Sequence, residues 1–174
     1  LDVTITYNIN GIGSTTINVA ANSSSTLPVS TSVAGTFNYN LESVAYQTAP
    51  NCSATVSGLA TVIVKPTPTA SISGTTSICQ NGAGAVITFT NPQALPVTIT
   101  YNINTGSPLT INVGANSTAT VTVSSSSPGT FTYTLLNVAY QSGPSCSTTI
   151  TGSATVTVNP EPLPFNVIGG GSYC

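Results

Sequence analysis

The residues of this 174-residue chain that could take part in chemistry are few, and four of them are cysteines. The chain has no histidine, and no two cysteines have the CxxC spacing of a zinc site. Because no base is available to activate a thiol, we do not expect a catalytic cysteine. Structural disulfides are the favoured interpretation, and they indicate an oxidising compartment. The candidates are Cys52, Cys79, Cys146 and Cys174.

Two pairings are open for these cysteines. Cys79 and Cys146 belong to the one nearly complete copy of an internal repeat, which favours a bond between them. However, an odd number of predicted strands separates the two, which places them at opposite ends of a module about 20 Å long. A disulfide needs Cα atoms about 6 Å apart. The alternative is a staple between modules, which would join Cys79 to a cysteine beyond this chain.

The charged residues are Asp2, Glu42, Lys65 and Glu161, and the net charge is −2. The carboxylates are scattered along the chain, and Leu136 replaces Glu42 in the second copy of the repeat. Acid–base catalysis and calcium sites both need carboxylates that converge. We therefore predict no enzyme activity, no cofactor and no metal. A single lysine excludes a basic nucleic-acid surface, and no run of about 18 apolar residues predicts membrane insertion.

The element that organises the chain is VTITYNIN, which occurs at Val3–Asn10 and again at Val97–Asn104. Strict alternation of apolar and polar residues predicts a half-buried β-strand, because successive side chains point to opposite faces. The apolar face must pack on a second sheet. The residues predicted to form this face are Val3, Ile5, Tyr7 and Ile9 in the first copy, and Val97, Ile99, Tyr101 and Ile103 in the second.

The whole chain repeats with a period of 94 residues. Leu1–Pro66 aligns with Leu95–Pro160 without a gap, and 39 of the 66 positions are identical. A long period that contains a β pattern predicts a tandem array of domains. We expect an all-β chain of immunoglobulin-like β-sandwich modules, each with about seven strands. The predicted modules are 1–66, which lacks its first two strands, 67–160, and a linker and first strand of a third module at 161–174.

Within the second module we predict strands at 69–73, 85–90, 97–104, 109–113, 118–124, 130–140 and 148–158, with 74–84 as a loop. In the sixth strand the apolar phase changes between Leu135 and Val138, which indicates a β-bulge. Gly152 lies inside the last strand, where it indicates a bend or a close backbone approach. The first module needs strands from flanking residues or from a neighbouring chain, and the flanking residues are the simpler source.

Thr-x-Thr pairs recur along the predicted strands, for example at Thr98 and Thr100. A flat array of threonines can order water and bind ice or a crystalline polysaccharide. The simpler interpretation is that threonines form the polar faces of ordinary strands, because their branched side chains suit a pleated surface.

Three segments together resemble the tandem immunoglobulin-like repeats of large secreted or surface proteins of Bacteroidota, many of which use type IX secretion. They are TASISGTTSICQNGAGAVITFT, GTFTYTLLNVAYQSGPSC and TGSATVTVNPEP. The resemblance implies an extracellular or cell-surface location and a role in a filament or adhesin stalk. The expected partners are further copies of the repeat, in the same chain or head to tail in a filament. A glycan is the alternative partner.

Overall fold

The computed structural model describes residues 1–166, 168–172 and 174. All regular elements among these residues are β-strands, which confirms the predicted fold class. No helix that could cross a membrane occurs in the described part of the chain. The chain divides into two compact units, which we call unit 1, Leu1–Pro66, and unit 2, Thr67–Cys174.

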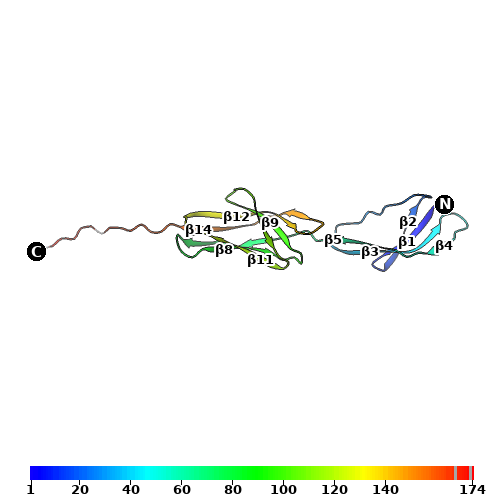
Figure 1. The fold of residues 1–174 in the computed structure, drawn as a ribbon, viewed down its shortest axis with the longest axis horizontal. Helices are drawn as coiled ribbons and strands as arrows, with labels where there is room; N and C mark the ends of the chain where they lie inside the picture. Colours follow the sequence, from blue (N-terminus) through cyan, green and yellow to red (C-terminus); the bar gives the residue numbers. More distant parts are fainter. Residues whose placement is uncertain (167, 173) are drawn as a thin grey trace. The chain divides into compact units, whose positions relative to one another are not determined.

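Unit 2 is built from two sheets. One sheet has the strand order β10-β9-β12-β14-β7, with β13 also paired to β12, and the other has the order β11-β8-β6. Figure 1 shows β8 and β11 in one layer of this unit and β12 and β14 in the other. The strands are β6 (Ser71–Ser73), β7 (Thr76–Cys79), β8 (Ala85–Asn91), β9 (Val97–Ile103), β10 (Leu109–Val113), β11 (Ser117–Val123), β12 (Gly129–Tyr140), β13 (Ser147–Thr149) and β14 (Ser153–Asn159).

The core of unit 2 lies between these two sheets. Alternate residues of each strand point inward, because successive side chains of a strand leave opposite faces. Fifteen hydrophobic side chains of the described residues are buried there, and they come from both layers. Phe89 of β8 and Tyr101 of β9 meet at the centre, with ring centroids 4.7 Å apart. The structure buries Val97 and Ile99 as well, while Ile103 is half-buried.

Unit 1 has a single sheet, in the order β2-β1-β3-β4 with β5 also paired to β3. Its strands are β1 (Val3–Ile9), β2 (Ile12–Val19), β3 (Gly35–Tyr46), β4 (Ser53–Thr55) and β5 (Leu59–Val64). Among the described hydrophobic residues of this unit, Tyr7 alone is buried, and Val3, Ile5 and Ile9 are half-buried. One face of the sheet therefore lacks a second layer.

The sheet of unit 1 has the same register as its counterpart in unit 2. Val3 lies opposite Val19 and Tyr46, and residues 94 positions later pair in the same way, with Val97 opposite Val113 and Tyr140. The predicted bulge is present in both units, between Leu135 and Asn137 in β12 and at the matching place in β3. The repeat in sequence is thus a repeat of strand pairing.

Three features differ from the predicted strands. The last strand is split into β13 and β14, because Gly152 between them has a φ of +152°. A Cβ at this glycine would come within 3.3 Å of Leu135, so the interruption is a close approach to the core. Residues 76–79, predicted as loop, form β7. No strand is assigned among the described residues of 161–174. Val167 and Tyr173 of the predicted third module lie outside the described residues, and that module stays a prediction.

Candidate functional surfaces

The first and last parts of unit 2 lie side by side. Strand β7 pairs in parallel with β14, with Thr76 opposite Val156 and Cys79 opposite Asn159. We call β7 and β14 the terminal strand pair. A parallel pair in one sheet requires the chain to cross between its members, and here the other strands of the unit form that crossover. Strands β7 and β14 therefore run in the same direction, while β6, which precedes β7, pairs with β8 in the other sheet.

Further hydrogen bonds extend the terminal strand pair at both ends. At one end the backbone N–H of Thr155 donates to the hydroxyl of Thr75 at 3.1 Å. At the other end the N–H of Gln80 donates to the carbonyl of Asn159 at 2.7 Å. The side-chain amide of Asn81 also donates to the carboxylate of Glu161 at 2.9 Å. Glu161, for which the sequence predicts no function, thus helps to hold the segment that follows β14.

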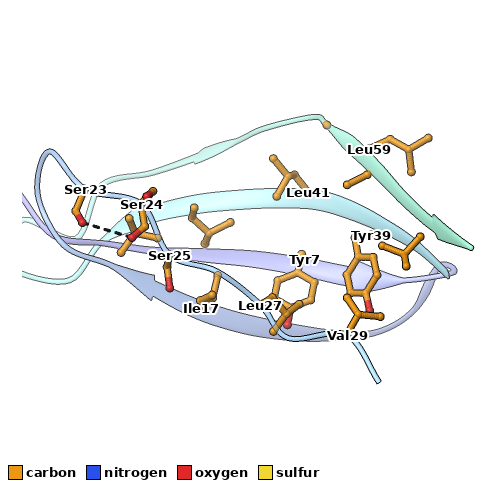
Figure 2. Close-up of a pocket in the computed structure, with 15 residues that line it drawn as sticks. Tyr7, Ile17, Ser23, Ser24, Ser25, Leu27, Val29, Tyr39, Leu41 and Leu59 are labelled. Carbon is orange, nitrogen blue, oxygen red and sulfur yellow. Dashed lines mark hydrogen bonds between the residues drawn. The ribbon is translucent and has the colours of Figure 1, made fainter. Parts of the chain in front are cut away.

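The uncovered face of unit 1 forms a groove of about 700 Å³. We call it the open groove. Figure 2 shows side chains from β1, β2, β3 and β5 and from the segment Ser23–Val29 turned toward it. Leu41 and Leu59 on its rim are 41% and 66% exposed. Its lining residues are Ile5, Tyr7, Ile17, Val19, Ser23, Ser24, Ser25, Leu27, Val29, Tyr39, Leu41, Gly58, Leu59, Ala60 and Val62.

The outer face of the larger sheet of unit 2 carries the predicted threonines. Thr98 and Thr100 are half-buried in β9. Several hydroxyls bond along the face instead of pointing freely to water. Thr98 donates to Asn112 at 2.8 Å, and the hydroxyls of Thr132 and Thr155 lie 3.2 Å apart. These lateral bonds are typical of cross-strand pairs that stabilise a sheet. Ice or glycan binding by this face stays a prediction.

The carboxylate of Glu42 in unit 1 is held by two neighbouring side chains. It accepts hydrogen bonds from the side-chain amide of Asn8 at 2.8 Å and from the hydroxyl of Ser14 at 2.7 Å. These two bonds lower the pKa of Glu42 below its ordinary value, because they favour the charged form. No group of three or more metal-ligating side chains occurs in the described part of the chain.

All four cysteines have free thiols. Cys79 lies beside Asn159, near the start of β12. Cys146 lies at the other end of β12, where its carbonyl accepts the N–H of Tyr140 at 3.1 Å. The 12 residues of β12 span roughly 36 Å at about 3.3 Å per residue. The disulfide between Cys79 and Cys146 is therefore not formed, because β12 separates them. Staples between modules, for which Cys52 and Cys174 are the other candidates, stay a prediction.

Comparisons with known proteins give few matches. No family model and no curated protein matches the chain. One solved structure that resembles it is described as a "Ca2+-stabilized adhesin" that "helps an Antarctic bacterium reach out and bind ice". The identity is 21% over 91% of this chain, the TM-score is 0.38, and the match spans 40% of that protein. A likeness at this TM-score carries no argument about the function of this chain.

Sequence reasoning missed the terminal strand pair. The segment Thr76–Cys79 has only Ile78 as a large apolar residue, and four residues are too few for alternation to be recognised. The resemblance of residues 165–174 to residues 70–79 was the available signal, since a recurring pattern of this kind indicates an ordered element. The parallel pairing itself has no local signature, because it joins residues about 80 positions apart.

Proposed function

We propose that the chain is a structural repeat segment of an extracellular filament or cell-surface adhesin stalk, and that its modules carry tension along the polypeptide. The observation that supports this function best is the parallel terminal strand pair of unit 2. In the same proposal the modules are immunoglobulin-like. Secretion by the type IX route in Bacteroidota rests on the sequence resemblance alone.

The direction of the two strands determines how a force acts on them. Tension on a filament would pull the chain before β7 and the chain after β14 in opposite directions. Because the strands are parallel, this pull slides one strand along the other and loads all their hydrogen bonds together. The bonds at Thr75 and Gln80 lie under the same load. A pull that separated the strands from one end would break these bonds one after another, at a lower force.

Pulling unit 2 in two directions tests this proposal. The native cysteines are replaced by serine, and new cysteines carry the handles of a force spectrometer. Handles at Thr67→Cys and Pro160→Cys load β6, which pairs with β8, and pull the terminal strand pair lengthwise. Handles at Asn81→Cys and Pro160→Cys pull the same pair apart from the end at Cys79 and Asn159. The lengthwise pull is expected to need the higher force at equal pulling speed, since forced unfolding follows the unfolding rate.

The matched control is the stability of the two cysteine variants without load. The lengthwise variant also carries Asn81→Ser, so that both variants lose the hydrogen bond from Asn81 to Glu161. Both should then show the same chemical denaturation curve, and only direction differs between the pulling experiments. Equal unfolding forces in the two directions would contradict a load-bearing role for the terminal strand pair.

A further inference from the structure

The face of the sheet that forms the open groove in unit 1 is covered by a second sheet in unit 2. Tyr7, Tyr39 and Leu41 line the groove, and the residues 94 positions later are Tyr101, Tyr133 and Leu135, which are 6%, 4% and 2% exposed. Both sheets have the same register, so the two faces present the same side chains in the same order. The exposed fraction of the leucine falls from 41% to 2% between them. The second layer of unit 2 accounts for this difference.

Strand β8 is the part of that layer which fills the core. It pairs with β11 on one side and β6 on the other. Ala85, Ile87 and Phe89 point inward and are 6%, 0% and 0% exposed. The ring of Phe89 packs on Tyr101, whose counterpart in unit 1 is Tyr7. The groove thus lacks two large apolar side chains at alternate positions of one strand.

In the sequence repeat, the segment Ser23–Val29 corresponds to the strand that pairs with β8 in unit 2. It is the counterpart of β11, Ser117–Val123, and shares Ser, Thr and Val at three of its seven positions. In unit 2 this segment is a strand that pairs with β8 along its whole length. In unit 1 no strand is assigned to it, although Leu27 and Val29 face the groove. A strand needs a neighbour to accept its backbone hydrogen bonds, and unit 1 provides none here.

We propose that the open groove is a docking site for a strand of the β8 type, supplied by another copy of the repeat. The incoming strand runs antiparallel to Ser23–Val29. In the incoming strand, the residue that corresponds to Asn91 lies opposite Ser23, and the residue that corresponds to Ala85 lies opposite Val29. This is the register in which β8 pairs with β11. The phenylalanine of the incoming strand packs on Tyr7. Recognition combines backbone pairing with side chains that fill alternate pockets.

Two details limit which strand fits. Asn91 is 1% exposed, and its amide donates to the carbonyls of Leu95 and Gly114 at 2.9 and 2.7 Å. The docked asparagine would meet the matching carbonyls of residues 1 and 20. The carbonyl of residue 20 also accepts the N–H of Ser23 at 3.2 Å, so an apolar residue in place of the asparagine would leave the carbonyl of residue 1 unpaired. Pro28 replaces Thr122 of β11. Since proline has no N–H, this position must turn its nitrogen away from the incoming strand, as an edge strand permits.

A synthetic peptide with the sequence of residues 83–94 tests the proposal on the full 174-residue chain. Hydrogen exchange of individual amides is followed by NMR. The peptide is expected to bind one to one and to slow exchange of Ser23–Val29 by at least roughly tenfold, with no change in β11. A peptide with aspartate in place of Ile87 and Phe89 should leave the exchange rates unchanged.

Two variants of the chain serve as matched controls. Leu41→Asp places a charge in the groove at a residue that is already 41% exposed, and is expected to abolish peptide binding. Ile63→Asp changes a residue of β5 that is 62% exposed and does not line the groove. It should bind the peptide as the parent chain does. Equal loss of binding in both variants would overturn the assignment of the site to the groove.

A longer chain keeps the test decisive if the peptide aggregates. In it, a second copy of residues 67–94 directly precedes Leu1, which reproduces the junction between residues 94 and 95. Ser23–Val29 should then exchange as slowly as β11. Unchanged exchange of this segment in the longer chain would overturn the proposal. A dimer of the 174-residue chain in which Ser23–Val29 is already protected while β8 stays paired with β11 would also overturn it, because a surface other than a β8-type strand would then fill the groove.

Discussion

Phe89 and Asn91 together attach the second layer of unit 2 to the first. Phe89 contributes an apolar ring at the centre of the core, while Asn91 satisfies two carbonyl groups that would otherwise be buried without a partner. Neither role is visible in the sequence, because the repeat pairs residues 1–66 with residues 95–160 and leaves β8 without a counterpart to compare.

Replacing Phe89 by alanine should destabilise unit 2 by about 3–5 kcal/mol, since removal of a fully buried ring leaves a cavity. Chemical denaturation, followed by the signals of unit 2, measures the change. Phe131→Ala is the matched control, because Phe131 belongs to the same unit but is only half-buried. It should lose less stability. An equal loss in both variants would show that Phe89 has no special place in the core.

Tyr133 and Tyr140 make the stability of unit 2 sensitive to alkali. Burial raises the pKa of both phenols above the ordinary value, because it disfavours the charged form. Their contribution to stability is complete below the unfolded pKa of about 10 and is lost as the pH rises through the higher folded pKa. Denaturation curves should therefore agree at pH 7 and 8 and shift to lower denaturant above about pH 10. In Tyr133→Phe this alkaline shift should be smaller, and an unchanged shift would exclude Tyr133 as its source.

At the scale of elements, the sequence predicts strands well where apolar and polar residues alternate over many positions. VTITYNIN forms β1 and β9, and the phase change in β12 appears as a bulge. The prediction fails where an element depends on a distant neighbour. Strand β7 exists because β14 lies beside it. Ser23–Val29 and β11 have related sequences, but only the second has a partner strand, and only the second is a strand.

The hydrogen bond between Thr75 and Thr155 should contribute to the terminal strand pair. Thr75→Val keeps the shape of the side chain and removes the acceptor of the N–H of Thr155. Unit 2 should lose about 1 kcal/mol of stability, and the force needed for the lengthwise pull should fall. The control is Ser77→Ala in β7, the strand that follows Thr75; the side chain of Ser77 is exposed and should matter little. Equal effects of the two substitutions on the unfolding force would contradict this role of Thr75.

At the scale of the whole molecule, two units with the same strand pairing differ in whether a second layer covers the sheet. Among the described residues, fifteen buried hydrophobic side chains form the core of unit 2, while eight of their counterparts in unit 1 line the open groove. Burial of apolar area is the main source of stability in such modules. The chain should therefore unfold in two steps, with unit 1 first, and completion of unit 1 by a β8-type strand should merge the steps.

The central claim is that the second layer determines how strongly the amides of the repeated strands are protected. Hydrogen exchange in the unmodified chain tests this claim most directly. Strands β1 and β9 have identical sequences from Val3–Ile9 and Val97–Ile103, so their amides exchange at nearly the same rate when unprotected. The account predicts that the amides of β9 exchange at least roughly 100-fold more slowly than those of β1. Equal protection of the two strands would contradict it.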